Sequence, residues 1–376
     1  MKESSIYIHI PFCDHKCIYC DFYSIITSDN IDNFLQSLLT EIKFYSKNYA
    51  DGRVFSTIFF GGGTPSLMKP EYLSRIISGL KNNFNISNDA EITMETNPGT
   101  VDKEKLLQFF NSGINRLSIG IQSFHNDDLS FLTRIHNKET AIETVYNAVK
   151  AGFENINIDL IFNLPNQTKE KWKQNLETSL SLPVKHISAY SLILERGTIL
   201  NKMVLDKKVT IREEDYDAEL YEMAIDNLTA AGFGQYEVSN FAKPGFECRH
   251  NKAYWRYNEY LGFGPSAHSF VGGRRWWNYS SLKHYIKVIE VNNHAQCGDE
   301  LLSEEQKLDE YIMLALRSYG LNINDFIKRF GEAWLQKNQH YIQTLINANI
   351  VERTEDFIRL TRRGYPVCDE ILRNLL

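Results

Sequence analysis

Residues 6–20 read IYIHIPFCDHKCIYC, and this stretch decides the fold of the chain. Its first five residues alternate in side-chain character, as a β-strand does. Three cysteines follow at once with the spacing C-x3-C-x2-C, at Cys13, Cys17 and Cys20. Thiolates are the usual ligands of iron–sulfur clusters, and three of them leave one iron of a four-iron cluster open to a small molecule. The stretch therefore predicts a strand followed by a cluster-binding loop.

A zinc site is the main alternative for these cysteines. Zinc prefers four protein ligands, so His9, His15 or a remote cysteine would have to complete the set. The other cysteines, Cys248, Cys297 and Cys368, are scattered along the chain and form no second closely spaced pair. In a reducing compartment, clustered cysteines indicate metal binding rather than disulfides.

Outward from this stretch, short strand-like runs alternate with helix-length segments as far as residue 190. The predicted strands are residues 6–10, 57–60, 91–95, 116–120, 155–159 and 186–190. Apolar residues lie on one face of a helix between the first two strands, at 31, 34, 35, 38, 39 and 42, and between the fourth and fifth, at 142, 145 and 149. Such alternation implies right-handed parallel crossovers. We therefore predict an α/β fold, a partial (β/α)6 barrel with its ligand site at the C-terminal ends of the strands.

The pattern changes after residue 190. Residues 212–231 predict one long charged helix, and residues 236–285 are rich in aromatic residues and glycine. Three helical patterns and a β-prone pair follow, at 304–316, 322–330, 334–348 and 350–360, and together they resemble a small winged-helix module in a C-terminal α+β region. We expect three parts: a barrel over 1–195, an aromatic-rich extension over 196–300 that packs on the barrel, and a winged-helix-like domain over 301–376.

The composition excludes several classes of protein. Hydrophobic residues make up 43% and charged residues 23%, so the chain is expected to fold. The net charge of −6 disfavours a nucleic-acid partner. The N-terminus lacks the order of segments found in a signal peptide, and the charge-free stretch 54–68 is shorter than the ~18 apolar residues of a membrane span. We expect a soluble, cytoplasmic protein.

At the cysteine motif the chain resembles the radical S-adenosylmethionine (SAM) superfamily. Within it, YIHIPFC at residues 7–13 and the Asp21-Phe22 continuation resemble the HemN/HemW group. That group comprises oxygen-independent coproporphyrinogen III dehydrogenases and HemW-type heme chaperones. The resemblance implies that the three cysteines hold a [4Fe–4S] cluster, that SAM binds the open iron, and that an electron donor reduces the cluster.

Further motifs fall at the ends of the predicted strands. The run FGGGTP at 60–65 follows the second strand, where glycines let backbone N–H groups approach a carboxylate or ribose, although a glycine run can also be a simple turn. Carboxylates and an arginine near later strand ends could bind ribose, amine or carboxylate groups, or could only cap helices. The resemblance implies SAM-binding roles for Tyr7, Tyr19, Gly62, Gly63, Thr64, Glu95, Gln122, Arg134 and Asp159.

Residues 249–255, RHNKAYW, match the signature that separates the HemW type from the dehydrogenases. A histidine imidazole can ligate heme iron, which makes His250 the candidate ligand and Cys248 a second one. The alternative is structural, with His250 satisfying buried backbone groups and the neighbouring aromatic rings filling an interface.

Two departures from the dehydrogenases favour the chaperone. Phe22 stands where those enzymes have a further cysteine, and only six residues precede Tyr7. We therefore expect a chaperone that binds the cluster, SAM and heme and delivers heme to a membrane acceptor protein. The main alternative is an enzyme, oxygen-independent coproporphyrinogen III oxidase (dehydrogenase), which decarboxylates propionate side chains; a radical SAM methyltransferase is the third. Whether the chain acts as an enzyme stays open at this point.

Overall fold

The computed structural model describes residues 1–27 and 29–376. Its strands are β1 Lys2–Ile10, β2 Arg53–Gly62, β3 Ile86–Thr96, β4 Arg116–Gln122, β5 Asn155–Phe162, β6 His186–Ser191, β7 Gly234–Gln235, β8 Asn240–Ala242, β9 Glu259–Phe263, β10 His268–Val271, β11 Arg274–Asn278, β12 Gln296–Leu301, β13 Leu321–Asn322, β14 Val351–Arg353 and β15 Phe357–Leu360. Its α-helices are α1 Ile31–Tyr49, α2 Pro70–Asn83, α3 Lys103–Asn111, α4 Asn126–Phe131, α5 Lys138–Lys150, α6 Lys169–Ser181, α7 Ile199–Leu205, α8 Glu214–Ala230, α9 Arg249–Trp255, α10 Leu282–Asn292, α11 Glu304–Leu316, α12 Ile323–Phe330, α13 Ala333–Asn347 and α14 Cys368–Leu375. Two short 3₁₀ helices, Pro65–Leu67 and Tyr365–Val367, complete the set.

One mixed sheet of twelve strands forms the centre of the described chain, in the order β12-β11-β10-β9-β1-β2-β3-β4-β5-β6-β8-β7. Strands β1 to β6 are parallel neighbours in chain order, so the six predicted strands and the α/β class are confirmed. Because neighbouring parallel strands end at the same edge of a sheet, the loops after β1 to β6 meet at one edge. That edge carries the candidate site.

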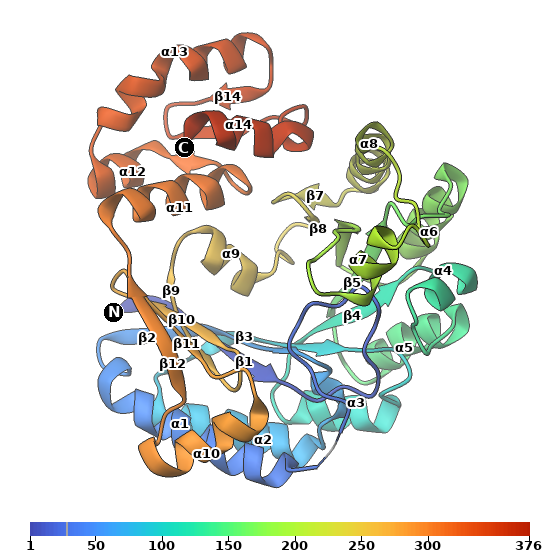
Figure 1. Cartoon of the computed structure of the whole chain (residues 1–376), viewed down its shortest axis with the longest axis vertical. Coiled ribbons are helices and arrows are strands. Elements are labelled where there is room, and N and C mark those ends of the chain that lie inside the picture. Colours follow the sequence, from blue (N-terminus) through green and yellow to red (C-terminus); the bar gives the residue numbers. More distant parts are fainter. Residues whose placement is uncertain (28) are drawn as a thin grey trace.

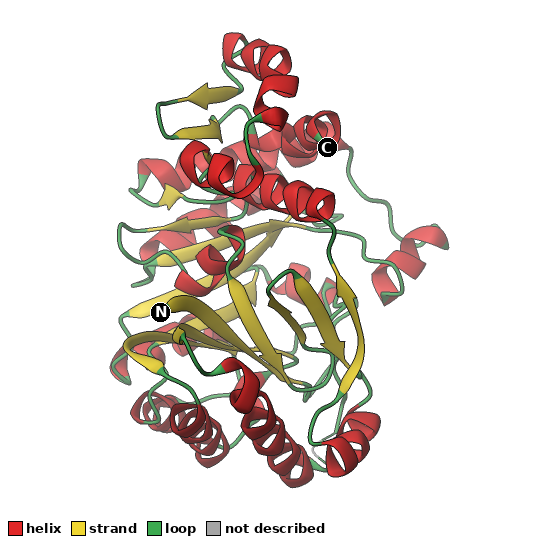
Figure 2. Ribbon diagram, turned by 90° about the vertical axis from the view of Figure 1, so that its left-hand side faces the viewer, coloured by secondary structure: helices red, strands yellow, loops and turns green. Residues whose placement is uncertain are grey.

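The aromatic-rich part of the chain extends the sheet at both edges. Strands β7 and β8 run antiparallel beside β6, while β9 joins β1 in parallel and leads to the antiparallel β10, β11 and β12. All twelve strands belong to one sheet, and the strands in Figure 2 are strongly curved. Residues 234–301 thus pair with backbone groups that the edges of a six-stranded sheet would leave exposed.

Helices cover the sheet according to their apolar faces. Helices α1, α2 and α10 lie together on one side, whereas α9 lies on the other, between the sheet and the C-terminal helices (Figure 1). The predicted face of α1 is confirmed, since Phe34, Leu35, Leu38 and Ile42 are fully buried. The predicted face of α5 is partly wrong, because Val149 is 40% exposed while two small residues, Ala141 and Ala148, turn inward. The buried face of α5 therefore includes small residues, which the pattern of large apolar side chains did not indicate.

The C-terminal residues form a second apolar core. Helices α11 to α14 pack around the small sheet β13-β15-β14, with Ile312, Phe326 and Leu372 buried at its centre. The three predicted helices and the β-prone pair are present. The winged-helix interpretation of this region stays a prediction. In the described part of the chain, no helix is both long and apolar enough to span a bilayer.

A buried carboxylate joins α1 to the sheet extension. Glu41 is 0% exposed and accepts hydrogen bonds from the Gly264 N–H (3.0 Å), the Asn278 amide (2.7 Å) and the Tyr285 hydroxyl (2.7 Å). The Asn278 amide also donates to the Gly264 carbonyl (2.9 Å), whereas no other acceptor for the Gly264 N–H or the Tyr285 hydroxyl is found among the described residues. Glu41 therefore fixes the strands β9 to β11 against the barrel.

We expect Glu41→Ala to lower the free energy of unfolding by about 3 kcal/mol, because it removes three buried hydrogen bonds and leaves the Gly264 N–H and the Tyr285 hydroxyl unpaired. Tyr285→Phe removes one of the three bonds and should cost about 1 kcal/mol. Denaturant unfolding followed by tryptophan fluorescence measures both values. Glu71→Ala on the exposed side of α2 serves as the control, with a change within about 0.5 kcal/mol. A loss below 1 kcal/mol for Glu41→Ala would show that Glu41 does not hold the extension.

Candidate functional site

A cavity of about 470 Å³ opens at the C-terminal ends of β1 to β6. Eleven of the residues predicted for cluster and SAM binding line it: Cys13, Cys17, Tyr19, Cys20, Gly62, Gly63, Thr64, Glu95, Gln122, Arg134 and Asp159. They come from loops or strands that are up to 146 residues apart in the chain, counting from Cys13 to Asp159. The fold therefore brings the predicted set together in what we call the first cavity.

The loop after β1 presents three thiols to this cavity. It is closed at its base by backbone hydrogen bonds from Cys13 N–H to the Ile25 carbonyl (3.0 Å) and from Ile25 N–H to the Pro11 carbonyl (2.8 Å). Cys13, Cys17 and Cys20 are partly exposed and form no disulfide. The donor set fits a four-iron cluster, in which each thiolate binds a different iron.

The zinc alternative fits this loop less well. Within the described residues, no three His, Cys, Asp or Glu side chains are grouped closely enough to share one metal ion. Both ring nitrogens of His9, one of the possible fourth ligands, already have partners, namely the Tyr7 hydroxyl at 3.2 Å and the Tyr23 carbonyl at 2.9 Å. His15, the other candidate, lines the cavity with a buried, unpartnered Nε2, so the preference for a cluster rests on the three-cysteine spacing and on the family resemblance.

The glycine run after β2 forms hydrogen bonds to neighbouring parts of the protein. The N–H groups of Gly63 and Thr64 donate to the carbonyls of Ile10 (2.8 Å) and Phe12 (2.7 Å), and the Gly62 N–H donates to Glu95 (3.2 Å). These N–H groups therefore bond within the protein, and the SAM-binding role of Gly62, Gly63 and Thr64 stays a prediction. The glycines remove side chains, since a Cβ on Gly63 would lie 2.5 Å from the Phe12 carbonyl oxygen.

Arg134 lies at the cluster end of the first cavity. One of its terminal nitrogens donates to the Asn97 side chain (2.7 Å) and the Gly120 carbonyl (2.6 Å), and the other lies 3.7 Å from the Cys17 sulfur. Asn97 also donates to Thr64 Oγ1 (2.9 Å), so it links the arginine to the glycine loop. Sequence reasoning missed Asn97, although it stands only two residues after Glu95.

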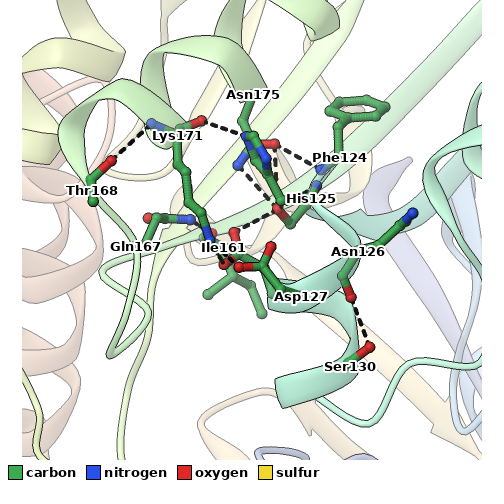
Figure 3. A network of polar contacts seen from close by, with 12 residues as sticks. Phe124, His125, Asn126, Asp127, Ser130, Ile161, Gln167, Thr168, Lys171 and Asn175 are labelled. Atoms are coloured by element: carbon green, nitrogen blue, oxygen red, sulfur yellow. Dashed lines mark hydrogen bonds and ion pairs between the residues drawn. The ribbon is translucent and has the colours of Figure 1, made fainter.

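A polar network positions the chain between Gln122 and Arg134 (Figure 3). Gln122 ends β4 with φ +71°. After it, Asn175 of α6 accepts hydrogen bonds from the Phe124 N–H (2.7 Å) and the Ser123 hydroxyl (3.3 Å), while Lys171 pairs with Asp127. Helix α6 thereby holds the start of α4 and the loop that leads to Arg134.

Two carboxyl groups on the cavity wall differ in their partners. Asp159 accepts from the Ser118 hydroxyl (3.0 Å) and the Asn157 amide (2.8 Å), and it caps no helix in the described structure. Glu95 accepts only from the Gly62 N–H among the described residues. Burial and the nearby Asp159 carboxylate raise the pKa of Glu95 to about 8. Glu95 is thus the carboxylate that has room for a ligand.

A second cavity of about 450 Å³ adjoins the first. Four residues line both: Asp21, Phe22, Phe59 and Asn251. The rest of its lining is mostly aromatic or imidazole: Tyr7, His9, Tyr23, His250, Tyr254, Tyr260, Ser266 and His268. The structure therefore places Tyr7 and His250 in this second cavity, apart from the other predicted residues.

His250 is 2% exposed in the wall of the second cavity. Its Nδ1 lies 2.8 Å from the Thr57 hydroxyl, and its ring stacks on Phe59 with centroids 5.0 Å apart. Its Nε2 is buried and has no hydrogen-bond partner among the described residues. Glu91 accepts from the backbone N–H of His250 (3.1 Å) and so fixes the start of α9. An unpartnered imidazole nitrogen is the atom with which a histidine ligates iron.

A parallel sheet with three cysteines on the loop after its first strand defines a radical SAM protein. The family model described as "Radical SAM superfamily" matches residues 7–178, and the model "HemN C-terminal domain" matches residues 302–367. Heme chaperone HemW of Lactococcus lactis is 34% identical, covering 100% of this chain and 98% of its own length, and that of Haemophilus influenzae is 40% identical, covering 99% and 97%. The chain therefore belongs to the HemW family of heme chaperones.

A solved structure shows the same fold. Coproporphyrinogen III oxidase (HemN) from Escherichia coli matches with a TM-score of 0.84 and 23% sequence identity, over 100% of this chain and 90% of that one. This likeness confirms the architecture over the full length. Since an oxidase and the chaperone family share the fold, function has to be argued from the site and from the sequence relatives.

We expect Cys13→Ala to abolish the brown colour and bound iron of the anaerobically reconstituted protein, because two thiolates are too few to hold a four-iron core. Iron content and visible absorption measure the outcome. The exposed Cys297, outside the cavity, provides the control: Cys297→Ala should keep full iron content. Unchanged iron in the Cys13 variant would contradict the cluster assignment.

We expect SAM to bind the cluster-loaded protein more tightly as pH rises from 6 to 8, by up to about tenfold per pH unit, and then to level off. The reason is that Glu95, with a pKa of about 8, is mostly protonated at pH 6 and accepts hydrogen bonds from SAM on both oxygens only when ionised. Calorimetry at several pH values measures the affinity. Glu95→Gln removes this titration while leaving that of SAM itself, so a variant with the wild-type pH profile would place SAM elsewhere.

Proposed function

We propose that this chain is a cytoplasmic heme chaperone that holds a [4Fe–4S] cluster and SAM in the first cavity and heme in the second. The observation that carries the proposal is the pair of adjoining cavities, one lined by thiols and polar strand ends and the other by aromatic rings and imidazoles. Aromatic rings suit a flat porphyrin, and an imidazole suits its iron. Membership of the HemW family supports the same assignment.

In the first cavity, Cys13, Cys17 and Cys20 would hold the cluster, which supplies the electron for reductive cleavage of SAM when both are bound. Arg134 borders the cluster end with Gln122 beside it at Gly120, and Glu95 accepts from Gly62 of the glycine loop. Tyr7 does not line the first cavity. It lines the second cavity, where its hydroxyl bonds to His9, so its part in SAM binding would be indirect.

In the second cavity, His250 is the proposed iron ligand through its unpartnered Nε2. His268 lines the same cavity but is exposed, and its ring stacks on Trp277, which makes it the alternative. Cys248 is 0% exposed and lines neither cavity, so it is a poor candidate. The proposal requires an electron donor for the cluster and an acceptor protein at the membrane that takes up heme.

The oxidase is the second candidate function, because it has the same fold. Phe22, which follows Cys20 by two residues, argues against it, since the dehydrogenases resembled by the sequence have a cysteine there. Phe22 is 62% exposed and lines both cavities, so it forms part of their shared wall. Relatives from Lactococcus lactis, Bacillus subtilis and Escherichia coli bear the chaperone name, which favours the chaperone over the oxidase and over a methyltransferase.

Anaerobic reconstitution followed by two separate assays tests the proposal. We expect the loaded wild-type protein to bind heme, with a distinct Soret band, and to release no carbon dioxide from coproporphyrinogen III. His250→Ala should shift or bleach the Soret band, whereas His268→Ala should leave it unchanged. Coproporphyrinogen turnover without heme binding would select the oxidase.

Thr57→Val separates ligation from packing. His250→Ala loses a buried hydrogen bond and ring stacking, so the protein should lose stability whether or not His250 binds iron. Thr57→Val removes the same hydrogen bond but keeps the imidazole, and it should therefore keep the Soret band. A His250→Ala variant with the wild-type heme spectrum would transfer the ligand role to His268.

A further inference from the structure

Arg116, the first residue of β4, is a buried cation without a partner. It is 2% exposed, yet it lines the first cavity. Its Nε is buried and unbonded, and among the described residues no acceptor or acid forms a hydrogen bond or ion pair with its guanidinium. Buried arginines are almost always paired, because an unpaired charge is costly to remove from water.

The acids nearest to Arg116 are already bound by other groups. Glu91 accepts from the backbone N–H groups of Arg249 (3.0 Å) and His250 (3.1 Å). Asp159 accepts from the Ser118 hydroxyl and the Asn157 amide. Both carboxylates act on the Arg116 charge through space, but neither is within ion-pair distance of it. The N–H groups along the edge of the guanidinium are therefore left for a ligand.

The position of Arg116 separates it from the cluster. Side chains of a strand alternate between its faces, and Arg116, Ser118, Gly120 and Gln122 all line the cavity. Gln122 lies at the loop end of β4, and Arg116 lies at the other end, roughly 20 Å away along the strand at about 3.3 Å per residue. Arg134 lies beside Cys17 at the cluster end. The first cavity thus has one arginine bound to protein groups near the cluster and one unbound arginine in its floor.

Arg116 is also close to the second cavity. Thr57, which bonds the His250 ring, pairs with Glu91 of β3, and Arg116 pairs with Thr93, two residues farther along β3. Burial, and after it the positive charge of Arg116, lowers the pKa of His250 to about 3. Both lie around the Glu91 carboxylate, which binds the start of α9. Asn251, the next residue of α9, lines both cavities and lies on the path from one to the other.

We propose that Arg116 binds a carboxylate of the heme held in the second cavity, namely a propionate arm that passes Asn251 into the floor of the first cavity. This assignment rests on the proposed heme-binding function. A carboxylate would pair with the guanidinium through two parallel hydrogen bonds and so satisfy the unpaired charge. SAM also carries a carboxylate, so the experiment has to distinguish the two sources.

Heme and heme dimethyl ester, in which both propionates are uncharged, are titrated into the cluster-loaded wild-type protein and its Arg116→Met variant. We expect the wild type to bind heme at least tenfold more tightly than the ester. In Arg116→Met the difference should fall below threefold, through loss of heme affinity and with the ester affinity unchanged. Arg116→Lys keeps the charge without the two-bond geometry and should give an intermediate preference.

Arg274→Met, at a surface arginine paired with Asp299, is the matched control and should keep the wild-type preference. Calorimetry with SAM on the same proteins should give unchanged affinity for Arg116→Met. A full preference for heme over ester in Arg116→Met would overturn the inference while the proposed function stands. If Arg116→Met binds SAM more weakly but keeps the preference for heme over the ester, the partner of Arg116 is the SAM carboxylate, and the inference is also overturned. Failure of the wild type to bind heme would overturn both.

Discussion

The site depends on the contact between two loops, the cysteine loop after β1 and the glycine loop after β2. Backbone hydrogen bonds from Gly63 to Ile10 and from Thr64 to Phe12 hold the loops together. No side chain fits between them at Gly63, because a Cβ would lie 2.5 Å from a carbonyl oxygen. The cysteine loop therefore takes its position from the rigid parallel pair β1 and β2, and the thiols inherit that position.

Polar side chains that follow the later strands line the rest of the first cavity. Asn97 binds the glycine loop on one side and Arg134 on the other. Arg134 in turn depends on the loop after β4, which α6 holds through Asn175. Asn97 thus links Arg134 to the first two strands, while α6, which follows β5, supports Arg134 from the other side.

The sequence was informative where a local pattern carries the structure. The six parallel strands and the three C-terminal helices follow from periodicity, and eleven of the twelve residues predicted to bind the cluster or SAM line one cavity because strand ends converge. Strands β7 to β12 were not predicted, because β9 and β8, which join this part of the chain to the sheet, pair with β1 and β6 more than 40 residues away. Asn97, Glu41 and Arg116 act through contacts across the fold, and spacing in the chain does not reveal them.

The wall between the two cavities belongs to the same loop that carries the thiols. Asp21 and Phe22 follow Cys20 directly and line both cavities, and Tyr23 bonds to His9 beside the second one. A group that orders this loop changes the free energy of binding in each cavity, and the effect is reciprocal by thermodynamic linkage. Any ligand that orders the cysteine loop from one cavity would therefore change the affinity of the other cavity for its own ligand.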